Sequence, residues 1–218
     1  MLPLKRLVNN WKQSIVIDYS LPLVTCIMPT ANRPEFMLRS IACFLEQDYF
    51  HKELVIIDDG ASSAARLVPW LFNVRYFYSQ PQKKIGTKCN IACEKAAGSI
   101  IVHWDDDDIY ASNWVSHQVS TLLHTRADVC GLNRIRYYDE RDQLYFTVDH
   151  ETKEDSWLSG ATLAYYRSFW KKHKFKDLQI AEHDVFIKNK EAKIFAHHYY
   201  DGFTATIHSK NVLIKEII

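Results

Sequence analysis

The chain has 218 residues, of which 47% are hydrophobic and 13% aromatic, a globular composition that excludes a largely disordered protein. Its 27 Lys and Arg residues against 26 Asp and Glu residues leave a net charge of +1, so we expect no nucleic-acid partner. No apolar run approaches the length of a transmembrane segment, no secretory signal is visible, and the cysteines show neither a CxxC pair nor zinc-finger spacing, so we expect a cytoplasmic protein.

Residues 1–21 form a basic and apolar lead-in that ends before Pro22. We expect an N-terminal arm over 1–21, packed on a single domain that covers 22–218. A surface helix that touches a membrane is the alternative for this arm, which leaves peripheral contact with the inner face of a membrane open.

The first half of the chain alternates between two kinds of segment. Four short apolar runs predict buried strands, at 23–28, 54–57, 74–78 and 100–103. Three segments with one apolar face predict helices, at 35–47, 87–97 and 112–124. Strands that alternate with helices are typical of βαβ units, so this half predicts a mostly parallel sheet flanked by helices.

The second half of the chain is less regular. Strand-like segments occur at 129–133 and 137–138, and 144–148 is expected to pair back as a hairpin. Short helices are expected around 169–173 and 184–190. With no internal repeat and no linker, the whole pattern predicts one α/β domain with a mixed, mostly parallel sheet.

Four consecutive carboxylates, Asp105–Asp108, directly follow the fourth predicted strand. Clustered carboxylates repel one another, and a divalent cation with oxygen ligands offsets the cost of ionising them. A solvated acidic turn that caps the next helix is the alternative interpretation. We favour a metal site because open α/β sheets place their ligands at the carboxyl ends of strands.

Other polar residues follow the first two predicted strands. The loop 29–34 comes after the first strand, and Asp58 and Asp59 end the second. A carboxylate there can accept hydrogen bonds from a nucleobase or a ribose, although either one could equally be a turn residue. Lys88 lies near the start of a predicted helix, where a cation gains nothing from the helix dipole. A bound diphosphate would explain Lys88, and a solvated surface lysine is the alternative.

Six segments, in this order and spacing, carry a resemblance to a known family: 24–34 (VTCIMPTANRP), 53–60 (ELVIIDDG), 85–92 (IGTKCNIA), 104–108 (WDDDD), 181–184 (AEHD) and 207–211 (IHSKN). Together they resemble the family 2 glycosyltransferases of the GT-A fold, and WDDDD is similar to the DxD element of that family. The resemblance covers nearly the whole chain. It implies the Rossmann-like fold of nucleotide-diphospho-sugar transferases and a nucleotide-sugar donor, with a UDP-sugar favoured.

The resemblance also implies roles for individual residues on the donor side. Asp59 is expected to contact the base and Lys88 the diphosphate. The loop after the first strand is expected to face the base and ribose with Pro29, Thr30, Asn32 and Arg33.

Within the acidic run, the resemblance implies that Asp105 reaches the ribose or the metal and that Asp107 binds the metal, Mn²⁺ or Mg²⁺. His208 is expected to supply another metal ligand. Asp108 is expected to orient the acceptor or the ligand shell, and Asp106 to point outward.

The catalytic base is where this chain departs from the family pattern. Relatives carry Glu-Asp, whereas Glu182 is followed here by His183, and Asp184 lies one residue further. Three interpretations stay open: Asp184 serves as the base after a shift in register, His183 serves because an imidazole can accept a proton near neutral pH, or the enzyme is impaired. A capping role of Glu182 and Asp184 before the next helix is compatible with each. We favour Asp184 narrowly.

The sequence thus predicts an inverting, metal-assisted transferase that moves a sugar to an acceptor hydroxyl in polysaccharide or glycoconjugate biosynthesis, on a glycan, lipid-linked or protein acceptor. A catalytically silent sugar-nucleotide or glycan-binding module is the alternative from another class, and the His183 departure favours it. A nucleotidyltransferase is weaker, because no phosphate-binding Gly-rich loop is present. The acceptor side is expected from Trp157 onward, where Trp157 itself is expected to pack in the core rather than on a sugar.

Overall fold

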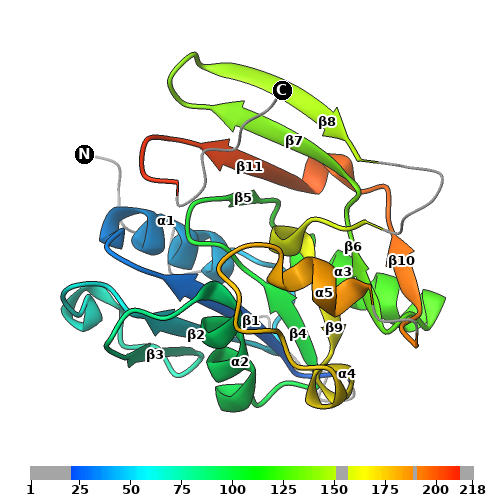
Figure 1. Ribbon diagram of the computed structural model, residues 1–218, viewed down its shortest axis with the longest axis horizontal. Coiled ribbons are helices and arrows are strands. Elements are labelled where there is room, and N and C mark those ends of the chain that lie inside the picture. Colours follow the sequence, from blue (N-terminus) through cyan, green and yellow to red (C-terminus); the bar gives the residue numbers. More distant parts are fainter. Residues whose placement is uncertain (1–20, 151–156, 189–190, 212–218) are drawn as a thin grey trace, which may run out of the picture.

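A large mixed sheet forms the centre of the molecule in the computed structural model, which describes residues 21–150, 157–188 and 191–211 (Figure 1). Its strand order is β10-β6-β9-β4-β1-β2-β3. The strands are β1 (Val24–Thr30), β2 (Lys52–Asp58), β3 (Val74–Tyr78), β4 (Ile100–His103), β6 (Val129–Gly131), β9 (Ala164–Tyr166) and β10 (Ile194–Ala196). Only β9 runs antiparallel to its neighbours, β4 and β6.

Helices cover both faces of this sheet. The helices α1 (Pro34–Leu45) and α3 (Trp114–Thr125) pack on one face, and α2 (Ile85–Lys95), α4 (Arg167–Lys172) and α5 (Glu182–Ile187) pack on the other. Short 3₁₀ turns lie between the elements: η2 (Ala65–Leu67), η3 (Gly160–Thr162) and η4 (Tyr200–Gly202).

The apolar runs of the sequence follow from this two-sided cover. In β1, Cys26 and Met28 join the core under α1, whereas Ile27 between them joins the core under α2. Because side chains alternate along a strand and both faces are buried, the positions over 23–28 are apolar except Thr25, whose hydroxyl donates a hydrogen bond to Glu53. The continuous pattern over 23–28 therefore predicts a central strand correctly.

A second, smaller sheet lies above the large one in the view of Figure 1. Its order is β5-β11-β7-β8, with the strands β5 (Ile109–Tyr110), β11 (Phe203–Ile207), β7 (Arg134–Asp139) and β8 (Leu144–Asp149). The expected hairpin over 137–148 is present as β7 and β8. Strand β11 pairs with β7 and with β5, and this brings the late segment 203–211 beside the acidic run.

The expected mixed, mostly parallel α/β sheet is confirmed, with shifts at several boundaries. Strand β1 continues through Pro29, which pairs with Ile57, so the loop begins later than predicted. Helix α5 begins at Glu182, two residues before the predicted start. The short strands β5, β9, β10 and β11 had no prediction.

The expected arm over 1–21 lies, except for Leu21, outside the described residues, and the domain boundary stays a prediction. In the part of the chain that the structure describes, no helix combines the length and the apolar character needed to span a membrane.

Candidate functional site

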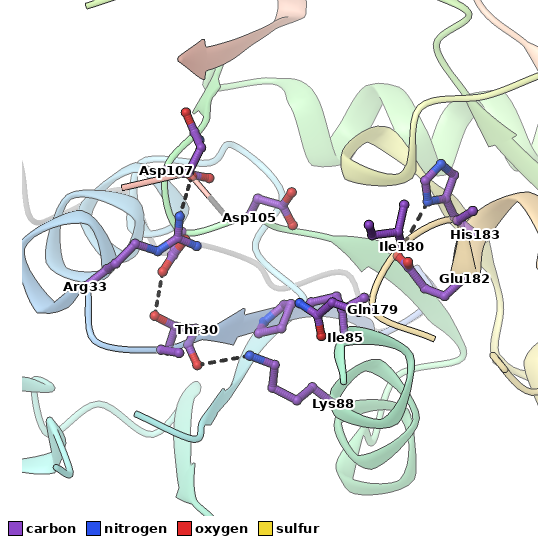
Figure 2. Close-up of a pocket in the computed structure, with 15 residues that line it drawn as sticks. Thr30, Arg33, Ile85, Lys88, Asp105, Asp107, Gln179, Ile180, Glu182 and His183 are labelled. Atoms are coloured by element: carbon purple, nitrogen blue, oxygen red, sulfur yellow. Dashed lines mark hydrogen bonds and ion pairs between the residues drawn. The ribbon is translucent and has the colours of Figure 1, made fainter. Parts of the chain in front are cut away.

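The three adjacent parallel strands β2, β1 and β4 end at the same edge of the large sheet, beside a cavity (Figure 2). Two walls face one another across it. The strand-end wall consists of residues from the ends of β1 and β4 and from α2, and the α5 wall consists of Gln179–His183. The lining residues are Pro29, Thr30, Ala31, Arg33, Ile85, Lys88, Asp105, Asp106, Asp107, Gln179, Ile180, Ala181, Glu182, His183 and Asn211.

The expectation that Asp106 points outward is wrong. Asp106 is 1% exposed, and its carboxylate accepts hydrogen bonds from the Thr30 hydroxyl at 2.5 Å and from an Arg33 guanidinium nitrogen at 2.6 Å. Burial raises the pKa of Asp106, and the charge of Arg33 and the Thr30 hydrogen bond oppose that rise. Asp106 therefore ties the acidic run to the β1–α1 loop.

Asp107 is held by several donors at one carboxylate oxygen. Arg33 Nη1 lies 2.7 Å from Oδ2, and the nitrogens His208 Nε2 and Asn211 Nδ2 each lie 3.1 Å from it. The His208 ring stacks on Phe36 with the centroids 4.2 Å apart. These contacts come from two segments, 33–36 and 208–211, that are far apart in the sequence, and they fix the direction of the Asp107 carboxylate.

The carboxylates of Asp105, Asp107 and Asp108 form a group that fits a metal ion. One oxygen from each lies within 4.8 Å of the others, and such an all-oxygen set suits Mg²⁺ or Mn²⁺. Among the described residues Asp108 completes this group, whereas His208 contacts Asp107. Asp108 is buried, and one of its oxygens accepts a hydrogen bond from the Thr206 N–H at 2.9 Å. Sequence reasoning assigned Asp108 only a loose role, because pairing with β11 was not foreseen.

Asp59 and Lys88 form a buried ion pair with Lys88 Nζ 2.9 Å from Asp59 Oδ1. The other Asp59 oxygen accepts a hydrogen bond from the Lys83 N–H at 2.7 Å. Lys88 lines the cavity and is not a solvated surface lysine, whereas Asp59 is covered. Asp59 is therefore held in the fold by Lys88 and by the backbone of Lys83.

Two polar residues beside the cavity have structural contacts. Asn32 adopts a left-handed conformation with φ of 56°, and its side-chain oxygen accepts a hydrogen bond from the Ala61 N–H at 2.7 Å. Asp58 accepts hydrogen bonds from the N–H groups of Gly60 and Ala64 and from the Tyr76 hydroxyl. A Cβ at Gly60 would lie 2.8 Å from the Asn32 nitrogen, so the two loops need glycine to approach this closely. Asn32 does not line the cavity that holds Lys88 and Asp105.

The α5 wall contains two of the three candidate bases. Glu182 and His183 line the cavity, and Figure 2 shows them across it from Asp105 and Arg33. Asp184 follows on α5 but is not among the lining residues. His183 lies between the two carboxylates, with Nδ1 3.4 Å from Glu182 and Nε2 3.3 Å from Asp184.

The surroundings of His183 set its protonation. Burial lowers the pKa of His183, but the hydrogen bond and charge of Glu182, with the charges of Asp184 and Asp105, outweigh burial and leave the pKa above its ordinary value. The 3₁₀ turn η3 packs on the ring, because a Cβ at Gly160 would lie 2.8 Å from His183 Nδ1. The imidazole is thus fixed by its packing, and the neighbouring carboxylates stabilise its charged form.

Sequence reasoning missed the segment that precedes α5. Gln179 and Ile180 line the cavity and are exposed, and neither residue type carries a signal for a site. Ala181 has a positive φ of 60°, which turns the chain into α5. Trp157 packs beside the hydrophobic core and against His150, as expected for a core tryptophan.

Comparisons with known proteins agree with this architecture. The profile of Glycosyl transferase family 2 matches residues 25–189. An uncharacterized glycosyltransferase of Haemophilus influenzae is 28% identical over 109 residues, which cover 48% of this chain and 44% of the relative. The putative colanic acid biosynthesis glycosyl transferase WcaA of Escherichia coli is 31% identical over 107 residues, 47% of this chain and 37% of the relative.

A third relative, the E. coli UDP-Glc:alpha-D-GlcNAc-diphosphoundecaprenol beta-1,3-glucosyltransferase WfgD, is 31% identical over 104 residues. These residues cover 46% of this chain and 41% of the relative, so the match spans less than half of each of the three relatives.

Two solved structures share the fold at low sequence identity. S. aureus TarS in complex with UDP-GlcNAc superposes with a TM-score of 0.63 at 14% identity, covering 86% of this chain and 59% of that one. The mannosyltransferase PcManGT of Pyrobaculum calidifontis, in complex with GDP-Man and Mn²⁺, gives a TM-score of 0.63 at 16% identity, covering 86% and 57%. Because the family profile spans most of the chain and the sheet is that of the GT-A enzymes, the chain belongs to the family 2 glycosyltransferases, as its motifs predict.

Proposed function

We propose that the protein transfers a sugar from a nucleotide-diphosphate sugar, with UDP as the favoured nucleotide, to an acceptor hydroxyl with inversion. One observation carries the proposal: a single cavity joins strand-end carboxylates and the cations Lys88 and Arg33 on one wall to Glu182 and His183 on the other. This arrangement suits a donor on the strand-end wall and an acceptor hydroxyl near the α5 wall.

The strand-end wall is suited to a diphosphate. Lys88 lines the cavity with its ammonium beside the Thr30 carbonyl oxygen, 3.4 Å away, and offers a charge to a phosphate. Asp105, Asp107 and Asp108 are the residues that would hold the cation. When bound, a divalent cation there neutralises charge on the departing diphosphate. Arg33 holds Asp106 and Asp107 in position.

The α5 wall offers the base. Glu182 is 8% exposed and lines the cavity, so its carboxylate is placed to accept a proton from an acceptor hydroxyl. His183, with Nδ1 3.4 Å from that carboxylate, orients it. Asp184, the residue that the sequence favours, remains the rival, and its position off the cavity lining supports it less.

The relatives suggest the class of donor and acceptor. The name of WfgD specifies UDP-Glc and a diphosphoundecaprenol-linked acceptor, and TarS was solved with UDP-GlcNAc, whereas PcManGT was solved with GDP-Man. For this chain we favour a UDP-sugar as donor and a glycan, either free or lipid-linked, as acceptor. The match with WfgD covers 41% of that relative, so donor and acceptor are both part of the proposal.

The test is a screen of UDP- and GDP-sugars with Mn²⁺ or Mg²⁺, reading out free nucleoside diphosphate, followed by NMR of the anomeric configuration of any product. We expect UDP to be released only when a metal is present and the Glu182 carboxylate is intact. Asp142→Asn, an exposed turn residue, is the matched control for loss of a carboxylate. Metal-dependent UDP binding without release from any donor would instead identify a binding module, and no binding of UDP or GDP would overturn the donor site.

A further inference from the structure

The segment between η2 and β3 exposes apolar side chains that the active-site cavity does not use. Trp70 is fully exposed, Phe72 is 97% exposed, and Leu67 and Leu71 are also exposed. We refer to residues 67–73 as the Trp70 loop. In Figure 1 this cyan segment lies at the edge of the molecule beside β3, the outermost strand of the large sheet.

The base of the Trp70 loop is fixed by the fold. The Leu54 N–H donates to the Asn73 carbonyl at 2.8 Å, and the Val74 N–H donates to the Leu71 carbonyl at 3.2 Å. Val68 packs against the core under α1. Because the backbone is held on both sides of Trp70, the outward direction of the aromatic side chains is a property of the folded chain.

The sequence segment that carries the Trp70 loop contains no carboxylate. The segment 60–78 contains Arg66 and Arg75 and no Asp or Glu. Arg75 pairs with Glu53 at 3.2 Å, whereas Arg66 is exposed on η2, next to Leu67. Exposed Trp, Phe and Leu side chains beside an arginine, with no carboxylate among them, match the interface of an anionic bilayer, where aromatic rings sit at the headgroup level.

The area of the loop argues against a second copy of the chain as its partner. Buried aromatic side chains contribute about 150–250 Å² each, so Trp70 and Phe72 supply about 300–500 Å². A stable dimer buries about 800 Å² on each partner. Insertion of a few side chains into a bilayer requires no such area, because the gain grows with each apolar group that leaves water.

We propose that the Trp70 loop docks the protein on anionic lipid membranes, with Trp70 and Phe72 inserted at the interface and Arg66 at the lipid headgroups. The inference rests on this loop and does not depend on the proposed function. It assigns membrane contact to an element other than the N-terminal arm.

The test is co-sedimentation of the full chain with vesicles of phosphatidylcholine, with and without phosphatidylglycerol. Trp70→Ser with Phe72→Ser is expected to lower the partition coefficient at least about tenfold on vesicles that contain phosphatidylglycerol. The thermal midpoint should stay near that of wild type, because both side chains are exposed. Arg66→Gln should weaken binding to these vesicles and reduce its salt dependence.

The matched control is Leu144→Ser with Tyr145→Ser, two exposed apolar residues on β8, which should bind vesicles as wild type does. The proposal is overturned if wild type binds neither vesicle, or if the Trp70 and Phe72 variant binds as wild type does. It is also overturned if that variant changes the molar mass in light scattering or lowers the thermal midpoint instead, since the loop would then contact a second copy or the chain itself.

Discussion

The strand-end wall of the cavity rests on three adjacent parallel strands, whereas the α5 wall comes from the exposed segment 176–180 and a helix of six residues. On the strand-end wall buried carboxylates have partners from distant parts of the chain, as Asp106 has in Thr30 and Arg33. On the α5 wall the partners of His183 are its two neighbours in sequence.

This difference separates a preorganised site from an adaptable one. Carboxylates held by guanidinium and hydroxyl donors cannot turn without losing several hydrogen bonds, which suits a diphosphate whose geometry is the same in every donor. An exposed segment such as 176–180 has fewer buried contacts and opens more easily. The α5 wall is therefore where we expect acceptor specificity to reside.

The largest effect is expected from a substitution in the α5 wall. Glu182→Gln keeps the shape of the side chain but removes its ability to accept a proton, so transfer should fall by about 10²–10⁴-fold. UDP affinity should stay near that of wild type, because Glu182 faces the strand-end wall across the cavity. Transfer rates and UDP calorimetry on the same variant measure the two quantities.

Asp184→Asn is the matched variant on the same helix and should lose less activity, because Asp184 does not line the cavity. If Asp184→Asn abolishes transfer while Glu182→Gln retains it, the base is the residue that sequence alone favours. Full activity in both variants would exclude both carboxylates as the base and would leave His183 as the remaining candidate on α5.

A second, smaller effect is expected on the strand-end wall. Asp107→Asn removes one charge from the group Asp105, Asp107 and Asp108, and the affinity for UDP in the presence of Mn²⁺ should fall by about 10²-fold. Without metal, the variant and wild type should bind UDP about equally. Calorimetric titration of UDP into wild type and Asp107→Asn, each with and without Mn²⁺, checks this. Asp142→Asn is the control. Equal UDP affinity in all four would show that the carboxylates hold no metal for the donor.

The strand-end wall was largely predictable from the sequence for a physical reason. A buried parallel strand has a continuous apolar pattern, and the residues after it must lie at the carboxyl edge of the sheet. The placement of Asp105 and Asp107 beside Thr30 and Lys88 followed from that rule and from the family resemblance. What the rule does not contain is the pairing of side chains, so the burial of Asp106 and the ion pair of Asp59 with Lys88 were not foreseen.

The α5 wall and the small sheet were much less predictable. Strand β11 has only five residues and pairs with β7, whose partner residues lie 68 positions earlier in the chain, a contact that no local pattern encodes. Gln179 and Ile180 line the cavity directly before Ala181, whose positive φ turns the chain into α5. Short elements that are held by tertiary contacts therefore cannot be predicted from the sequence, even where the adjacent residues belong to a recognisable motif.

The ion pair of Asp59 and Lys88 tests whether paired groups on the strand-end wall also stabilise the fold. Asp59→Ala leaves the Lys88 ammonium without its carboxylate partner, which should lower the free energy of unfolding by about 2 kcal/mol. The cost is lower than for a fully buried charge, because Lys88 lines the cavity and water can reach it. The corresponding drop in the thermal midpoint is about 4–8 °C for a chain of this size.

The double variant Asp59→Ala with Lys88→Met serves as the control, since it removes both charges and should recover much of the loss. An unchanged thermal midpoint in Asp59→Ala, together with weaker UDP binding, would indicate that Asp59 acts on the nucleotide and contributes little to the stability of the fold.

The smallest expected effect concerns the pH dependence of the α5 wall. The carboxylates of Glu182, Asp184 and Asp105 raise the pKa of His183 in the folded protein, so the protonated ring stabilises the fold. That contribution is fully present below the unfolded value of about 6.5 and is lost as the pH rises through the folded pKa. Thermal midpoints of wild type and His183→Asn should therefore differ most at acid pH and converge at alkaline pH.

Glu182→Gln supplies the control for this pH dependence, because it removes the nearest charge that raises the pKa of His183 and should narrow the difference at acid pH. If the difference in thermal midpoint between wild type and His183→Asn instead widens with rising pH, burial outweighs the carboxylates in setting the pKa of His183, and the ring is neutral. His183 would then be a candidate base itself, and transfer activity in wild type should fall as the pH drops through the pKa of the ring.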